Sequence, residues 1–213
     1  MNYSIEVAKA LLEVKAVFLR PNEPFTWASG IKSPIYCDNR LTLAYPSKRD
    51  LIEKAIAETV KEKFSEAEVL MGTSTAGIPH AAIVSDILKM PMGYVRGENK
   101  SHGRCNKIEG APAKGKKVVV IEDLISTGGS SLEVVEALRE EGADVLGLIS
   151  IFTYGMEKAK VRIAEAKVNA VSLCDFNTLV EVALNIGYIS EKEKRMLIAF
   201  MSNPSDPSWQ EVK

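Results

Sequence analysis

Cysteine and histidine are scarce in this chain, and the few that occur form no metal-binding pattern. Among its 213 residues there are only two histidines and three cysteines, Cys37, Cys105 and Cys174. The cysteines are far apart and lack CxxC spacing, which argues against a disulfide framework and against a zinc site. A reducing compartment suits such a chain, and we expect the protein to be cytoplasmic.

The chain also lacks long apolar runs and an excess of one charge. No stretch approaches the roughly 20 apolar residues that a helix needs to cross a bilayer. The N-terminal residues 1–18 alternate charged and apolar side chains instead of forming a signal-peptide core. The formal net charge is −1, which gives no global attraction to nucleic acid or to a membrane surface. We therefore expect no nucleic-acid partner and no membrane partner.

What the sequence does contain is an alternation of strand-like and helix-like segments. Short apolar runs predict strands at residues 69–71, 92–96, 118–121, 145–152 and 170–173. Helical spacing predicts helices between them, at about residues 48–63, 78–88, 131–141 and 157–166. This order predicts an α/β fold with a parallel sheet flanked by helices, whose ligands bind at the carboxyl ends of the strands.

The two ends of the chain fall outside this alternation. Residues 1 to about 45 predict a helix and then irregular or extended chain, and residues 176–201 predict a helical tail. We interpret both as a small N-terminal/C-terminal cap on a single domain that spans residues 1–213. The polar residues 203–213 are expected to fray.

The most informative segment is residues 118–131, with the sequence VVVIEDLISTGGSS. Its apolar start predicts a strand buried on both faces. Two acids, Glu122 and Asp123, stand at the expected strand end, and a loop rich in glycine and hydroxyl groups then opens a helix. Such a loop is a phosphate cradle, because free backbone N–H groups and the positive end of the helix dipole face an anion there.

Carboxylates would repel a phosphate unless they contact something else. We therefore assign Glu122 and Asp123 to sugar hydroxyls or to a bound Mg²⁺. The alternative is that they are merely a solvated strand end. A Walker A loop is excluded, because no lysine occurs between Lys117 and Lys158, and the dinucleotide fingerprint GxGxxG is absent from the chain.

This segment resembles the signature that binds PRPP (5-phosphoribosyl 1-diphosphate) in type I phosphoribosyltransferases. The resemblance implies the fold of that family and a Mg²⁺ cofactor that PRPP carries, with no protein metal site that is certain. It also implies that the loop holds the 5′-phosphate and that the acids meet the ribose hydroxyls. The implied PRPP-binding residues of this segment are Glu122, Asp123, Leu124, Ile125, Ser126, Thr127, Gly128, Gly129 and Ser130, and Ser126 is also implied to reach orotate.

A second segment, residues 96–110, has the sequence RGENKSHGRCNKIEG and is cationic and rich in glycine. A loop of this kind can close over a polyphosphate and neutralise departing oxygens, although an ordinary solvated loop is the alternative. It resembles the catalytic loop of orotate phosphoribosyltransferases. The resemblance implies that Arg96, Lys100 and His102 contact PRPP, that Lys100 and His102 are catalytic, and that the loop reaches the neighbouring active site of a homodimer. Family members often have a further lysine where this chain has Gly97 and Glu98.

Two more segments support the same resemblance. Residues 72–80, GTSTAGIPH, correspond to the pyrophosphate loop, and His80 within them is expected to be a structural histidine. Residues 25–40 contain the FTxxSGxxSP pattern that distinguishes orotate enzymes from purine enzymes. Some relatives carry lysines at the positions of Ala28 and Ala76, so the chain resembles the branch found in Gram-positive bacteria, which lacks them.

Together the motifs imply a Mg²⁺-dependent transferase that joins orotate to PRPP, giving orotidine 5′-monophosphate and pyrophosphate in pyrimidine biosynthesis. Two alternatives stay open. One is a regulator that keeps the fold, senses PRPP and binds RNA or DNA, which would require a basic face. The other is a phosphoribosyltransferase for a purine or another pyrimidine, which the FTxxSGxxSP pattern disfavours.

Overall fold

A computed structural model describes residues 3–26, 30, 32–97 and 107–212 of the chain. The chain divides into two compact units, Ser47–Leu173 and a unit formed by Met1–Pro46 together with Cys174–Lys213. The two end segments, for which we predicted a cap, thus pack with each other. The organisation as one domain stays a prediction. None of the helices within the described ranges is long and apolar enough to cross a membrane.

The unit Ser47–Leu173 is built on a six-stranded sheet with the strand order β10-β9-β8-β5-β6-β7. Its strands are β5 (Val69–Thr73), β6 (Met92–Val95), β7 (Ile108–Gly110), β8 (Lys117–Ile125), β9 (Asp144–Thr153) and β10 (Ala170–Asp175). The neighbours β6, β5, β8 and β9 pair in parallel, whereas β7 is antiparallel to β6. The predicted fold class, a mostly parallel sheet flanked by helices, is therefore confirmed.

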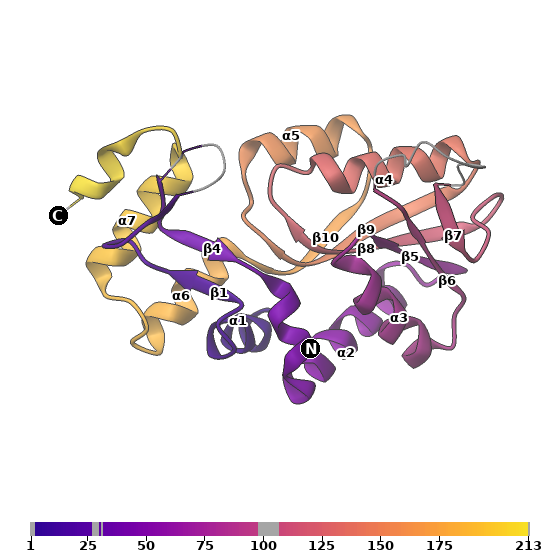
Figure 1. Cartoon of the computed structure of the whole chain (residues 1–213), viewed down its shortest axis with the longest axis horizontal. Helices are drawn as coiled ribbons and strands as arrows, with labels where there is room; N and C mark the ends of the chain where they lie inside the picture. Colours follow the sequence, from indigo (N-terminus) through magenta and orange to yellow (C-terminus); the bar gives the residue numbers. More distant parts are fainter. Residues whose placement is uncertain (1–2, 27–29, 31, 98–106, 213) are drawn as a thin grey trace. The chain divides into compact units, whose positions relative to one another are not determined.

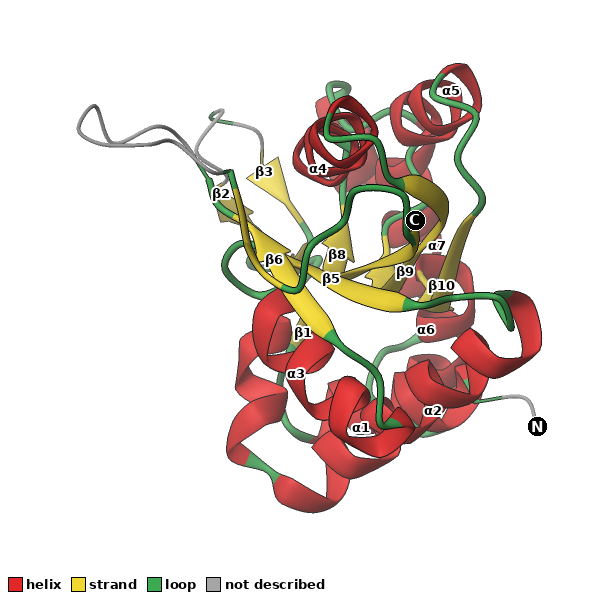
Figure 2. Ribbon diagram, turned by 90° about the vertical axis from the view of Figure 1, so that its right-hand side faces the viewer, coloured by secondary structure: helices red, strands yellow, loops and turns green. Residues whose placement is uncertain are grey.

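Four helices cover this sheet. They are α2 (Pro46–Lys63), α3 (Gly77–Leu88), α4 (Gly129–Glu140) and α5 (Glu157–Glu165). Helices α4 and α5 lie on one face and α2 and α3 on the other (Figures 1 and 2). Since both faces are covered, the apolar run at the start of β8 is fully buried, as its composition predicted.

Among the predicted boundaries that were wrong, two concern the segments with predicted site residues. Strand β8 does not end at Ile121 but continues to Ile125, because its pairing with β9 extends to the partners Ile125 and Thr153. Glu122 and Asp123 therefore lie within a strand. The second error concerns the segment 96–110, whose last three residues form β7 on the edge of the sheet, where Tyr94 pairs with Glu109.

The other unit contains short strands and helices from both chain ends. Strand β1 (Val17–Leu19) pairs with β4 (Ile35–Cys37), and β2 (Phe25–Thr26) pairs with β3 (Lys32–Ser33), both antiparallel. Its helices are α1 (Ser4–Glu13), α6 (Phe176–Asn185), α7 (Glu191–Ser202) and the 3₁₀ helices η1 (Asn39–Ala44) and η2 (Pro207–Glu211).

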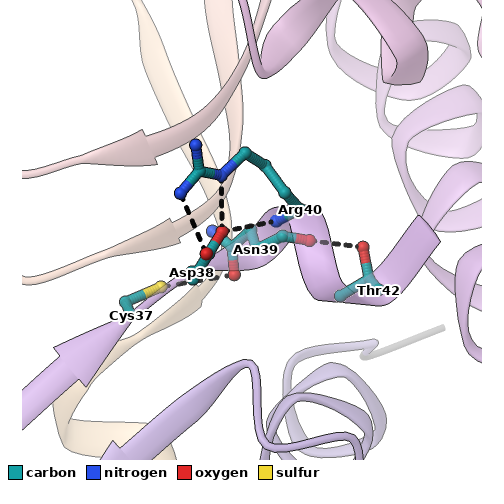
Figure 3. Close-up of polar contacts among 5 residues, drawn as sticks. All are labelled: Cys37, Asp38, Asn39, Arg40 and Thr42. Carbon is teal, nitrogen blue, oxygen red and sulfur yellow. Dashed lines mark hydrogen bonds and ion pairs between the residues drawn. The ribbon is translucent and has the colours of Figure 1, made fainter. Parts of the chain in front are cut away.

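Figure 3 shows the turn that links β4 to η1 in this unit. The Asp38 carboxylate accepts hydrogen bonds from the Arg40 backbone N–H and from the Arg40 guanidinium, with the shortest contact at 2.7 Å. This pair caps the start of η1, and its guanidinium holds the pKa of Asp38 below its ordinary value. Thr42 closes the turn by donating to the backbone carbonyl of Asn39.

The expectation that residues 203–213 fray was wrong for the part that the structure describes, residues 203–212. Trp209 in η2 is only 2% exposed, and its ring meets Phe200 of α7 edge to face at 5.6 Å between centroids. Asp206 begins η2 by accepting a hydrogen bond from the backbone N–H of Ser208. A single buried tryptophan therefore anchors a segment whose overall composition is polar.

Candidate active site at the ends of the parallel strands

The carboxyl ends of β5, β6 and β8 meet at one edge of the sheet, where ligands of open α/β sheets bind. The loop that follows β5 is tied to the end of β6, because the Ser74 hydroxyl donates to the Val95 carbonyl across 2.5 Å. The Ser74–Thr75 peptide bond in this loop is cis. Gly77, which begins α3, packs so closely on β8 that an added Cβ would lie 2.3 Å from the Ile121 carbonyl oxygen.

The predicted phosphate cradle is shorter than the sequence suggested. Only residues 126–128 form the loop, whereas Gly129 and Ser130 already belong to the first turn of α4. Gly128 occupies the N-cap position with φ 77°, a left-handed conformation that favours glycine, and no side chain caps the helix. Within the described parts of the chain, the side-chain hydroxyls of Ser126 and Thr127 make no hydrogen bond. This helix end thus offers N–H and hydroxyl donors to an anion.

Glu122 lies in the last part of β8, before this loop, and is 5% exposed. Its Oε1 accepts hydrogen bonds from the Thr73 hydroxyl at 2.6 Å and from the Asp123 backbone N–H at 3.0 Å. Its Oε2 accepts from the Ser131 hydroxyl at 2.9 Å. Burial, and next the neighbouring Asp123 side chain, raise the pKa of Glu122 from 4.5 to about 7. Glu122 therefore links β5, β8 and α4 through one carboxyl group.

Asp123, the second predicted acid, differs from Glu122 in its surroundings. Its side chain is half-buried, so it is more accessible than the carboxyl group of Glu122. Of the two acids, Asp123 is therefore the one that a ligand reaches without displacing the hydroxyls of Thr73 or Ser131. Leu124 is likewise half-buried, and Ile125 is buried at the end of β8.

His80, in the segment predicted to form the pyrophosphate loop, has the surroundings of a structural histidine. His80 lies in α3, is 0% exposed, and its Nδ1 is 2.5 Å from Oε1 of Glu53 on α2. Glu53 is equally buried, and burial raises its pKa above the ordinary value, although the bond to His80 opposes that rise. The pair joins two helices on one face of the sheet.

The cationic loop is described only at its two ends. Arg96 is exposed directly after β6, and its guanidinium forms a 2.9 Å ion pair with Glu109 on β7. Glu109 also accepts a hydrogen bond from the Tyr94 hydroxyl. Lys100 and His102, the predicted catalytic residues, lie outside the described residues, as does Ala28.

The donor set at this edge fits a metal ion that enters with a substrate. The described ranges contain no cluster of three or more His, Cys, Asp or Glu side chains. Mg²⁺ is commonly held by one or two carboxylates together with substrate phosphates, and keeps several waters. Asp123, on the strand before the predicted phosphate cradle, is a carboxylate suited to that role, so the residues present fit a Mg²⁺ ion that a substrate carries.

The comparisons with known proteins agree with this geometry. Residues 44–181 match the family described as Phosphoribosyl transferase domain. An orotate phosphoribosyltransferase from Listeria innocua is 58% identical over 204 residues, which cover 96% of this chain and 98% of that protein. The chain belongs to the orotate phosphoribosyltransferase family.

Two further members of the orotate phosphoribosyltransferase family support the assignment. The protein from Lactococcus lactis is 54% identical over 210 residues, 99% of this chain and 100% of its own length. The crystal structure of the enzyme from Aeropyrum pernix superposes with a TM-score of 0.75 at 33% identity, covering 86% of this chain and 99% of that one. The family predicted from the sequence is therefore confirmed.

Three residues that shape this site were not predicted from the sequence. Thr73 and Ser131 are the hydroxyl partners of Glu122, and Arg162 on α5 donates to the Thr127 carbonyl of the phosphate loop. Both hydroxyls lie in segments with a predicted role, Thr73 in residues 72–80 and Ser131 in residues 118–131, and that membership was the available signal. No sequence pattern pointed to Arg162, because it lies 35 residues after Thr127 in the chain.

Proposed function

We propose that this protein transfers the phosphoribosyl group of PRPP to orotate, giving orotidine 5′-monophosphate and pyrophosphate in pyrimidine biosynthesis. A ring nitrogen of orotate forms a bond to the anomeric carbon and gives up its proton to solvent, while the bond from that carbon to the pyrophosphate oxygen breaks and pyrophosphate leaves with the electron pair. The relatives named above support the reaction. The structural observation that supports it most directly is the N-terminus of α4, which no side chain caps and which follows the acid-bearing strand β8 after the short loop 126–128.

In this proposal, the first turn of α4 and the loop before it bind the 5′-phosphate. Ser126, Thr127 and the backbone N–H groups from Gly128 to Ser130 supply the donors, and Ser126 also reaches orotate. Asp123 holds the ribose hydroxyls. Glu122 either shares this task or orients the site through Thr73 and Ser131, its two protein partners. The pyrophosphate lies against the loop after β5, where backbone donors replace the lysine that is absent at Ala76.

The negative charge that develops on pyrophosphate requires cations. Mg²⁺ carried by PRPP would supply Lewis-acid stabilisation of the leaving group when bound. Arg96, Lys100 and His102 add positive charge from the protein, with Lys100 and His102 as the catalytic residues, in a homodimer whose loops serve the neighbouring sites. To contact the substrate, Arg96 has to leave its ion pair with Glu109. That ion pair is solvent-exposed and therefore weak. The same proposal places the protein in the cytoplasm.

A base panel tests this function. The purified protein is mixed with Mg²⁺, PRPP and, in separate reactions, orotate, uracil, adenine, guanine or hypoxanthine, and base consumption is followed by absorbance. Consumption of orotate alone is the expected result. Consumption of a purine instead would overturn the base assignment, and PRPP binding without turnover of any base would indicate a PRPP-sensing regulator.

A further inference from the structure

The phosphate loop is supported from behind by helix α5, which lies beside α4 on the same face of the sheet (Figures 1 and 2). An added Cβ on Gly128 would lie 3.8 Å from Ala159, and one on Gly129 would lie 3.4 Å from Nη1 of Arg162. Ala159 and Arg162 are three residues apart, so they project from one side of α5. A side chain at either glycine would therefore touch that side of α5, so α5 lies close behind the backbone of the predicted cradle.

Arg162 makes a polar contact with the loop itself. Its Nη1 donates to the Thr127 carbonyl oxygen across 3.4 Å, and the side chain is half-buried. Within the described part of the chain, Arg162 forms no ion pair with a carboxylate. A positive charge without an acidic partner thus stands beside the start of α4, where it adds to the positive end of the helix dipole.

The contact also orients one peptide group. In a trans peptide unit the carbonyl oxygen and the following N–H point in opposite directions. When Arg162 binds the Thr127 carbonyl on the α5 side, the N–H of Gly128 points away from α5. A carbonyl left unbound would be free to turn toward the phosphate and repel it, so the arginine favours the peptide orientation that presents a donor.

We propose that Arg162 is a positioning residue for the 5′-phosphate of the substrate, acting through the Thr127–Gly128 peptide group and through its own charge. The inference rests on the proposed function, because it requires that this loop receive a phosphate.

Arg139 provides a matched control. It also bridges α4 and α5 by donating to backbone carbonyls, those of Ala166 at 2.7 Å and Lys167 at 3.2 Å. However, it lies in the last turn of α4, at the end opposite the loop. Arg139→Gln therefore removes a comparable helix-to-helix contact without touching the cradle.

The test is calorimetric titration with ribose 5-phosphate and, separately, with Mg²⁺-pyrophosphate, together with the KM for PRPP. Arg162→Gln is expected to weaken ribose 5-phosphate binding and raise the KM for PRPP by roughly tenfold, the scale of losing one charge-assisted contact. Pyrophosphate affinity is expected to stay unchanged. Arg162→Lys keeps the charge and should recover part of the loss, and it also serves as the test variant if the glutamine variant does not fold.

Three outcomes decide the matter. Loss of ribose 5-phosphate affinity in the Arg162 variants but not in Arg139→Gln supports the inference. The inference is overturned if Arg162→Gln binds ribose 5-phosphate as tightly as the wild type, or if Arg139→Gln loses as much affinity. Arg162 would then serve only as a contact between α5 and the loop. If the wild-type protein itself neither binds ribose 5-phosphate nor consumes orotate, the proposed function fails, which is a different result from failure of the arginine variants alone.

Discussion

The hydroxyl of Thr73, the last residue of β5, donates a 2.6 Å hydrogen bond to Oε1 of Glu122 on the neighbouring β8. An acid expected to face a sugar therefore also holds two strands together at the site edge. The hydroxyl of Ser131 on α4 donates to the other carboxylate oxygen. The Glu122 carboxyl group therefore connects the predicted pyrophosphate loop with the predicted phosphate cradle. Changes at Glu122 should consequently affect stability as well as ligand binding.

Stability should depend on pH through Glu122. Between its ordinary value of 4.5 and its raised pKa of about 7, the folded protein binds the proton more tightly than the unfolded chain. The free energy of unfolding should therefore fall as pH rises through this window, by on the order of 3 kcal/mol at most. Glu122→Gln should flatten that slope. Urea unfolding of the ligand-free protein at about pH 5 and about pH 8 measures it; equal slopes in both proteins would refute the prediction.

The two acids should differ in their effect on substrate affinity. Replacing both Glu122 and Asp123 by their amides should weaken Mg²⁺-PRPP binding by roughly tenfold or more, since charged hydrogen bonds to ribose are lost, while the fold remains intact. Asp123→Asn alone should account for most of the loss, because Asp123 is the more accessible acid. Calorimetric titration with Mg²⁺-PRPP measures these affinities. An unchanged affinity in the double variant would show that neither acid contributes to PRPP binding.

Lys100→Ala should lower kcat by roughly 10²-fold or more, the scale for removing one preorganised electrostatic contact to a departing group. The fold should be unaffected. Lys114→Ala, at an exposed lysine in the turn before β8, is the control and should leave kcat unchanged. A wild-type kcat for Lys100→Ala at saturating PRPP would contradict the assignment of the loop.

His80→Leu should destabilise the protein without disabling the chemistry. Removal of the imidazole leaves the buried Glu53 without the partner that lies 2.5 Å away, and such a loss costs about 3–5 kcal/mol. Adding Glu53→Leu to this variant should recover part of the stability, because the unpaired acid is then gone. Chemical denaturation compares the variants. A large fall in kcat of folded His80→Leu would instead point to a catalytic histidine.

The C-terminal segment should contribute to stability. Trp209→Ala removes a buried ring that packs on Phe200, and truncations of this size cost about 3–5 kcal/mol. Trp209→Phe keeps an aromatic partner and should lose much less. Thermal unfolding distinguishes the two variants from the wild type. Identical melting of Trp209→Ala and the wild type would support the original expectation that this segment frays.

Local patterns in the sequence determined the fold class because they carry the physics of buried parallel strands. The apolar run at 118–121 predicted a strand covered on both faces, and the glycines after it predicted the start of a helix; β8 and α4 are found there. The ends of the elements were less well defined. Strand β8 continued through Glu122 and Asp123 because β9 supplied pairing partners, and no local pattern reports the length of a neighbouring strand.

The sequence by itself determined the family, the parallel sheet and the identity of the acids and hydroxyls at the phosphate loop, since all of these depend on residues close together in the chain. Tertiary structure decided which partners those groups have. The contacts of Glu122 with Thr73 and Ser131, of His80 with Glu53, and of Arg162 with Thr127 join different elements of the fold. Such contacts arise from chain packing, and packing also sets the burial that raises the pKa of Glu122.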